Sequence, residues 1–497
     1  MRQRTTFFHH NDDGVEPADL KITSDSLSGP DLVAIREDKI TLDLQELPGE
    51  LRELLARSSE LHLRWESPRR RDATELWPSR VTPGLHVFYT PRSDDKAETG
   101  HMCRTLRNTF GVMDCQTPKD SFTKLPKSEF KHSAAYHYYH PLSDLKHFGL
   151  YAGQYACGPS DSACAKKFAS LDSATSFDFS YDASVDTVKA SIMWPRGKQP
   201  LSLTAVPGHR LEVGIMTPDA PPYVGPDELG VAGLLVVLGE HQKPNPTLFA
   251  FPARHKASRV KFASRFLSPA GLHPSLQLKI SSAKPPINDE SCSMYAHLTL
   301  PRTIFGDRYQ LQDDLFLASK NLTALRYMSE PVDLEAPDYV MKLWGSSILL
   351  ELKPPQPTTD QPWTAEVPLH LRYLAPTPGG YQTISIPYPA LFWACEAEQG
   401  IKFTNSPFDR PHVGYDSLFS AETLFWHIDP QPERTNLLTN DINVPVLNTE
   451  QATWVNAGTT LVVMLGFGWI LWKLVWVAQR SGLSSKTPNE LLAKKQQ

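Results

Sequence analysis

The stretch "EVPLHLRYLAPTPGGYQTISIPYP", residues 366–389, consists of two segments in which apolar and polar side chains alternate, joined by a turn rich in proline and glycine. Successive side chains of a β-strand point to opposite faces, so a period of two predicts strands. The first segment would divide its residues between the two faces, with Leu369, Leu371 and Tyr373 on one and His370, Arg372 and Leu374 on the other. We expect one face to be buried and the other to be polar.

The same alternation recurs through residues 201–445, for example in "HRLEVGIM", "LQLKISS", "YAHLTLP" and "SSILLELKP". The chain of 497 residues contains 43 prolines and 27 glycines. Because proline lacks a backbone donor, this content argues against long helices. The apolar run "VAGLLVVLG", which begins at Val231, is too short to cross a membrane and predicts a buried strand. We therefore predict a mainly β fold with antiparallel, β-sandwich-like domains.

Residues 1–200 differ from this pattern and are expected to form a separate N-terminal domain, mixed but β-rich. The segment "LPGELRELLARS" (47–58) predicts a helix, and "ELHLRWES" (60–67) predicts a strand. Histidines are frequent between residues 132 and 147, but neither helical nor strand spacing brings three of them to one face. We interpret them as hydrogen-bonded or solvated residues rather than a metal site.

A transmembrane helix is predicted over residues 457–478, where Lys473 is the single charge. A helix of this length spans about 33 Å, close to the hydrocarbon thickness of a bilayer. Three tryptophans cluster around Lys473 in the C-terminal half, which suits the membrane interface: Trp469, Trp472 and Trp476. The long stem of Lys473 can carry its charge toward the headgroups.

The charges that flank this helix predict its orientation. No Lys or Arg occurs in the fifteen residues before Ala457, whereas Arg480, Lys486, Lys494 and Lys495 follow it. The positive-inside rule therefore places the tail, residues 479–497, in the cytosol and the large N-terminal part in the lumen. The alternative is a tail-anchored protein with its bulk in the cytosol, because no cleavable signal peptide begins the chain. With the tail in the cytosol, Lys494 and Lys495 resemble a dilysine signal for retrieval to the endoplasmic reticulum.

Two further features favour the lumen. An even number of cysteines permits up to three disulfides, and Cys157 and Cys164 are close enough in sequence to form a local one. The alternative is six buried thiols in a reducing compartment. The chain also contains one sequon, at Asn321, which accepts a glycan only in the secretory lumen.

No catalytic motif was found among the patterns typical of hydrolases, nucleotide-binding enzymes or metalloproteases. The formal net charge of −5 also argues against a nucleic-acid-binding protein, which would need a positive face. We expect no catalytic residues, no metal and no cofactor.

The block "PLHLRYLAPTPGGYQTISIPYPALFWACEAE", residues 368–398, resembles the PIG-X family, whose larger fungal members are called protease B nonderepressible proteins. The resemblance covers residues 205 to 480 and is supported by "SLQLKISSAKPP", "SMYAHLTLPRTIF" and the single C-terminal helix. It is carried by these residues: His370, Arg372, Tyr373, Pro376, Tyr381, Pro387, Pro389, Phe392, Trp393 and Cys395.

This resemblance implies a non-catalytic accessory subunit of GPI mannosyltransferase I in the endoplasmic reticulum. The implied partner is a multi-pass catalytic subunit, similar to PIG-M, which adds the first mannose to the glycosylphosphatidylinositol (GPI) precursor. Two alternatives remain, a general luminal chaperone and an independent luminal enzyme. Within the membrane, Gly466 and Gly468 allow close helix packing, so we expect them, together with Lys473, to contact the partner.

Overall fold

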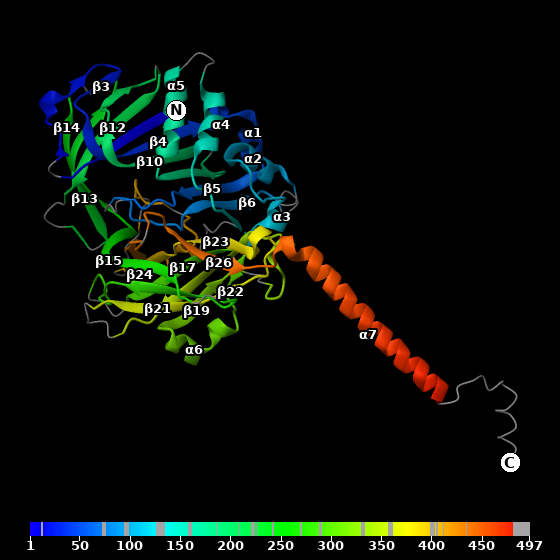
Figure 1. Cartoon of the computed structure of the whole chain (residues 1–497). Coiled ribbons are helices and arrows are strands. Elements are labelled where there is room, and N and C mark those ends of the chain that lie inside the picture. Colours follow the sequence, from blue (N-terminus) through cyan, green and yellow to red (C-terminus); the bar gives the residue numbers. More distant parts are fainter. Residues whose placement is uncertain are drawn as a thin grey trace. The chain divides into compact units, whose positions relative to one another are not determined.

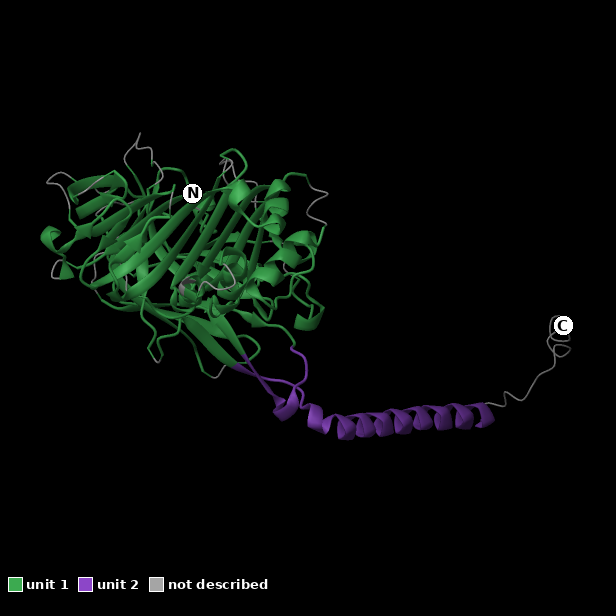
Figure 2. Cartoon of the chain, turned by 90° about the horizontal axis from the view of Figure 1, so that it is seen from above, with its two compact units in different colours: residues 1–373, 384–442 green, residues 374–383, 443–497 purple. Residues whose placement is uncertain are grey.

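The computed structural model describes residues 1–480 except for short gaps at 11–12, 72–75, 94–98, 126–134, 158–161, 186, 207, 220–223, 226, 241–242, 269–270, 288–290, 330–332, 356–360, 398–402, 404–405, 411 and 434. The chain divides into two compact units, coloured separately in Figure 2. Unit 1 comprises residues 1–373 and 384–442, and unit 2 comprises residues 374–383 and 443–497.

Unit 1 is built on two large sheets (Figure 1), and the first of them has 11 strands. All of its neighbouring strands are antiparallel except β1 and β12. Strands from both sides of residue 200 join this sheet, so the division between 1–200 and 201–445 stays a proposal. In spatial order the strands are β14 (Asn245–Pro252), β13 (Glu228–Val237), β12 (Arg210–Pro218), β1 (Arg2–Phe8), β4 (Leu32–Asp43), β10 (Thr187–Gln199), β9 (Ser176–Asp182), β5 (Ser58–Glu66), β6 (Gly84–Pro91), β8 (Tyr136–His140) and β7 (Thr123–Lys124).

Helices cover one face of this sheet. Leu54 and Leu55 of α1 (Gly49–Ala56) and Phe110 of α2 (His101–Phe110) pack in one core with Leu63 and Trp65 of β5. The other helices of this half are α3 (Pro118–Ser121), α4 (Lys146–Ala156) and α5 (Ser162–Ala169). The predicted helix at 47–58 and strand at 60–67 are thus confirmed as α1 and β5, since their apolar residues repeat at the spacing that this core requires.

The second sheet has eight strands, of which only β15 and β25 pair in parallel. One helix, α6 (Asp314–Ser319), precedes β19. The mainly β prediction is therefore confirmed. The run at Val231 forms the strand β13 as expected, but only Val231, Val236 and Val237 of this strand are buried and its other residues are half-buried. The strands of the second sheet, in spatial order, are β19 (Leu322–Met328), β20 (Gly345–Leu352), β17 (Ser293–Pro301), β24 (Ala390–Glu396), β25 (Thr423–Pro430), β15 (His255–Phe266), β16 (Ser275–Ile280) and β21 (Trp363–Pro368).

Three small sheets complete the fold. One of them contains part of the segment after residue 366, for which a continuous alternating strand was predicted, and here the structure differs from the prediction. The strand stops at Pro368, and only His370 and Leu371 resume it; Tyr373 is exposed although it was expected to share a face with buried Leu369. Proline lacks the N–H that a continuous ladder needs, so the strand breaks there. The small sheets are β11 (Ser202–Thr204), β3 (Ser26–Ser28) and β2 (Lys21–Ile22); β18 (Ile304–Phe305) and β22 (His370–Leu371); and β23 (Tyr381–Pro387) and β26 (Thr439–Pro445).

Unit 2 carries the C-terminal helix α7 (Ala452–Arg480), which contains the predicted span. Among the described residues, α7 is the one helix that has the length and composition to cross a membrane, with a mean hydropathy of 2.0 in its most apolar window. Backbone hydrogen bonds join Thr377 to Leu447 and to Thr449, just before α7. The turn that makes this possible has Gly379 and Gly380 at φ of 82° and 77°, which only glycine adopts without strain.

Candidate functional site

The face of the 11-stranded sheet opposite the helices is polar in its central part, across β4, β10, β9 and β5, although Ile35 and Met193 on this face belong to an apolar cluster. On β5, His62 and Arg64 alternate with the core residues Leu61 and Leu63, and the same division holds on the neighbouring strands. A row of polar side chains crosses four strands in register: Lys39 pairs with Ser191, Ser191 with Asp178, and Asp178 with Arg64. A sheet with one face on a core normally turns such residues to water.

Part of this polar face is covered by described residues of the segment between β24 and β25, namely 403, 406–410 and 412–421. Arg410 of that segment is buried and contacts three residues of the sheet: it donates to Glu66 and to Ser176, and its Nε lies 3.1 Å from Asp178. On β4, the Nζ of Lys39 donates to the carbonyl of Pro407 at 3.0 Å. The segment is thus joined to the sheet by ion pairs and hydrogen bonds, and also by Phe408, which packs in an apolar cluster with Ile35 and Met193 of the sheet.

A cavity of about 860 Å³ remains between the polar face and this segment. Its lining contains five cationic and five carboxylate side chains: Lys39, Arg64, Lys189, Arg254 and Arg410, and Glu37, Asp178, Asp182, Asp409 and Asp416. Its volume lies in the range of small-molecule sites, about 300–1,000 Å³. The cavity lies wholly within unit 1.

Burial shifts the pKa values of several charged side chains in this lining. It raises the pKa of Glu37 despite nearby Lys39, and it lowers the pKa of both Lys39 and Arg64. Burial also raises the pKa of Asp409 to about 7, although the Arg254 N–H donates to this carboxylate at 3.1 Å. Removing charges from water costs several kcal/mol each unless they are paired, so such clusters are candidates for functional sites.

His62 is the most exceptional residue of the lining. Its side chain is 5 % exposed, and neither ring nitrogen has a hydrogen-bond partner within the described part of the chain. Its ring stacks on that of His412, with 3.9 Å between the centroids. His412 has a φ of 62°, which is rare for a residue with a side chain, and donates its N–H to Asp416. Strained backbone of this kind concentrates at functional sites.

The sequence did not point to this cavity. Alternation in "ELHLRWES" signals a polar face on β5 but not what covers it. The covering residues lie more than 300 positions further along the chain, as the bond between Arg410 and Glu66 shows by its separation of 344. The histidines that the sequence did single out are not in the cavity lining: His137 and His140 lie on β8 and His147 on α4, while His132 is outside the described residues. Among the described residues, no group of three or more His, Cys, Asp or Glu is placed to hold a metal ion.

The sequon residue Asn321 lies between α6 and β19 and is exposed. It adopts a φ of 56°, and its side-chain amide donates to the carbonyl of Thr364 at 2.8 Å. Thr323, the third residue of the sequon, is also exposed. The site is thus on the surface, as a glycan requires, and its occupancy stays a prediction.

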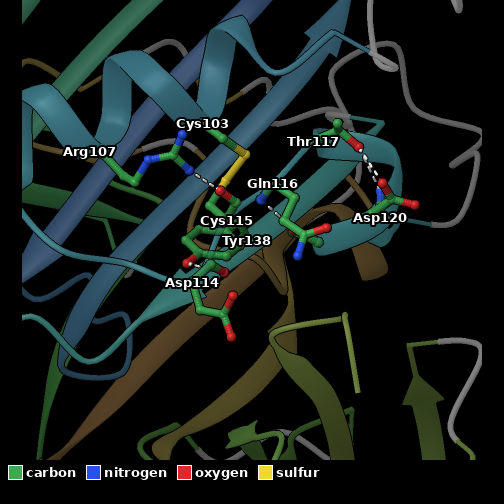
Figure 3. Close-up of a disulfide and its surroundings, with 9 residues drawn as sticks. Cys103, Arg107, Asp114, Cys115, Gln116, Thr117, Asp120 and Tyr138 are labelled. Atoms are coloured by element: carbon green, nitrogen blue, oxygen red, sulfur yellow. Dashed lines mark hydrogen bonds between the residues drawn. A yellow bond between two sulfur atoms is a disulfide. The ribbon is translucent and has the colours of Figure 1, made fainter. Parts of the chain in front are cut away.

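The structure joins the six cysteines in three disulfides. Cys157 bonds to Cys164 and so joins α4 to α5, as proposed from their spacing, and Cys292, just before β17, bonds to Cys395 on the neighbouring strand β24. The third disulfide, between Cys103 and Cys115, ties α2 to the loop that follows it (Figure 3). Around it, Arg107 donates to the carbonyl of Cys115, and Tyr138 donates to that of Asp114 at 3.0 Å.

The predicted membrane contacts lie on α7. A Cβ at Gly466 or Gly468 would meet no other atom within 4 Å, so neither glycine is packed against another part of the described chain. The Nζ of Lys473 lies 5.0–5.3 Å from three tryptophan rings, an arrangement that shields its charge on the helix itself: Trp469, Trp472 and Trp476. Lys494 and Lys495 lie outside the described residues.

Comparisons with known proteins agree with the resemblance seen in the sequence. The family model described as PIG-X / PBN1 matches residues 269–475. "Protein pbn1" of Neurospora crassa is 49% identical over 98% of this chain and 97% of its own length, and "Protein PBN1" of Gibberella zeae is 46% identical over 97% of each. "Protein PBN1" of Saccharomyces cerevisiae is 26% identical over 60% of this chain and 67% of its own length.

The similarity to the filamentous-fungal relatives extends through both large sheets and α7, beyond the region of the family model. The family supports a role in GPI-anchor biosynthesis, and its name implies a partner in the GPI mannosyltransferase complex. On this full-length similarity, the chain belongs to the PIG-X / PBN1 family.

Proposed function

We propose that the chain is a non-catalytic accessory subunit that stabilises GPI mannosyltransferase I and is needed for addition of the first mannose to the GPI precursor. The observation that carries this proposal is the family membership along nearly the whole chain. The membrane helix supports the same proposal. An enzyme that uses a lipid-linked sugar donor needs a bundle of membrane helices to hold it, whereas the described residues supply one apolar helix, so the bundle would come from the partner. The proposed partner is a multi-pass, PIG-M-like catalytic subunit.

We further propose a place and an orientation for this subunit. The endoplasmic reticulum is the proposed location, with residues 1–455 in the lumen and the tail in the cytosol, where Lys494 and Lys495 would act as a retrieval signal. The three disulfides and the exposed Asn321 support a luminal body, because disulfides persist in oxidising compartments. Within the membrane, Gly466 and Gly468 form the proposed contact with a partner helix, since small residues allow close approach of backbones.

Affinity purification tests the proposal. The full chain is tagged at its N-terminus, so that the C-terminal lysines stay free, and is purified from membranes. We expect one multi-pass mannosyltransferase in stoichiometric amount. The double variant Gly466→Leu, Gly468→Leu should reduce that yield severalfold, while Gly458→Leu, on the same helix, should not.

Two results would contradict this proposal. Recovery of many unrelated secretory proteins would indicate a general chaperone, and recovery of no partner would favour an independent luminal protein. Equal yields from the double variant and the Gly458→Leu control would place the contact outside the helix.

A further inference from the structure

Trp454 is a large exposed side chain that the predicted membrane span does not account for. It is 82 % exposed and lies on α7, shortly before that span begins at Ala457. Two more exposed side chains occur in the same compact unit outside the span, Tyr381 at 69 % and Leu447 at 54 %. Single apolar residues are common on protein surfaces, whereas several of them in one short region mark a contact surface.

These residues lie in or next to a hydrogen-bonded structure at the start of α7. We call it the collar, and it consists of residues 377–381 and 446–451. Backbone hydrogen bonds join its two segments, one of them from the N–H of Val446 to the carbonyl of Gly380 at 3.0 Å. The second segment ends in the short helix η10 (Thr449–Gln451), and α7 begins at the next residue. The collar is therefore continuous with the membrane helix, and both belong to unit 2 (Figure 2).

The collar and its flanking residues carry almost no charge. Residues 374–383 contain no acidic or basic side chain, and residues 443–456 contain Glu450 alone. Without Lys or Arg, this surface has nothing to attract an anionic lipid. It fits zwitterionic headgroups, where Trp and Tyr are enriched because each combines an apolar ring with a polar N–H or O–H.

The tryptophans of α7 indicate how deep the helix lies in a bilayer. Trp454 and Trp476 are on one continuous helix and are separated by about 33 Å at 1.5 Å per residue. The hydrocarbon of a bilayer is about 30 Å thick, so with Trp476 at one interface Trp454 lies at the other. The headgroup layer adds about 5–7 Å on each side, which corresponds to about four further residues of helix. That layer therefore reaches Glu450 and the collar.

We propose that the collar is a membrane-contacting surface, with Trp454, Tyr381 and Leu447 in the headgroup layer of zwitterionic lipids at the N-terminal end of α7. The contact would fix the depth at which the helix enters the bilayer, because sliding in either direction would move these side chains into water or into hydrocarbon. This inference rests on α7 spanning a membrane, but it does not depend on the proposed mannosyltransferase partner.

Fluorescence quenching by brominated phosphatidylcholine tests this contact on the purified full chain in nanodiscs. Bromines near the headgroup quench interfacial tryptophans, and bromines near the bilayer centre quench deep ones. The chain has 11 tryptophans, so the signal of Trp454 is the difference between the wild type and Trp454→Phe. In the Trp454→Phe background, Tyr381→Trp reports on the collar. We expect both signals to be quenched about twofold or more strongly by the headgroup bromines than by the central ones.

The matched control is Leu465→Trp, in the same background and near the middle of α7. It should show the reverse order, with stronger quenching by the central bromines. If Leu465→Trp is not quenched, α7 does not span the bilayer, and both the anchoring and the collar contact are wrong. If Leu465→Trp is quenched but Trp454 and Tyr381→Trp are not, the collar faces water or a protein. That result overturns this inference and leaves the membrane helix and the proposed function intact.

Discussion

At the scale of single residues, the main feature of this protein is a set of charges buried between the 11-stranded sheet and the segment that covers it. Arg410 has the strongest set of partners, since Glu66, Ser176 and Asp178 all contact its guanidinium. Removing one partner of such a cluster leaves another charge unpaired, which typically costs about 3–5 kcal/mol. The cluster therefore holds Arg410 and the described residues next to it, 406–409, on the sheet and so shapes the cavity.

Asp409 provides a pH-dependent test of this cluster. Burial raises its pKa to about 7 from the usual value near 4, so the folded state binds a proton that the unfolded state releases. Stability should thus fall as pH rises from about 4 to about 7, because the folded state then has to bury the charged form. Asp409→Asn should stabilise the protein by about 1–2 kcal/mol at pH 8 and have little effect at pH 4.

Thermal unfolding of the full chain at both pH values measures this effect. Asp172→Asn, at an exposed position, serves as the control and should not change the pH dependence. An Asp409→Asn variant that is equally or less stable than the wild type at pH 8 would show that the carboxylate is ionised and satisfied in the folded protein.

At the scale of elements, the sequence predicted a helix or strand correctly where the spacing of apolar residues within that one segment was enough to identify it. Three segments were predicted in this way: α1 from its 3.6-residue repeat, β5 from its alternation, and α7 from its uninterrupted apolar run. The prediction was wrong after Pro368, where Tyr373 is exposed, since a missing donor ended the strand. The cavity could not be predicted, because β5 shows a polar face whether water or a distant segment covers it.

The charges that flank helix α7 predict how the protein is oriented in the membrane. Because Lys and Arg flank only its C-terminal end, protease added to intact microsomes should leave residues 1–455 undigested and remove the tail. Immunoblotting with antibodies to each end distinguishes the products. Detergent, which opens the vesicles, is the control and should allow digestion of the body. Digestion of the body without detergent would establish the tail-anchored arrangement instead.

At the scale of the whole molecule, a large disulfide-linked body is followed by an apolar helix, the one helix among the described residues that could cross a membrane. That organisation suits a protein that holds or stabilises a membrane enzyme from the luminal side, which is the function we propose. The full-length similarity within the PIG-X / PBN1 family shows that both large sheets belong to the conserved unit of these fungal relatives.

The most direct test of the account is the GPI intermediate that accumulates when the chain is depleted. Cells are labelled with radioactive inositol, and the lipids are separated by chromatography and identified by digestion with mannosidase. We predict accumulation of the precursor that lacks mannose, a fall in the abundance of the catalytic subunit, and rescue by the wild-type chain. Accumulation of a precursor that already carries mannose, or an unchanged lipid pattern, would contradict the account.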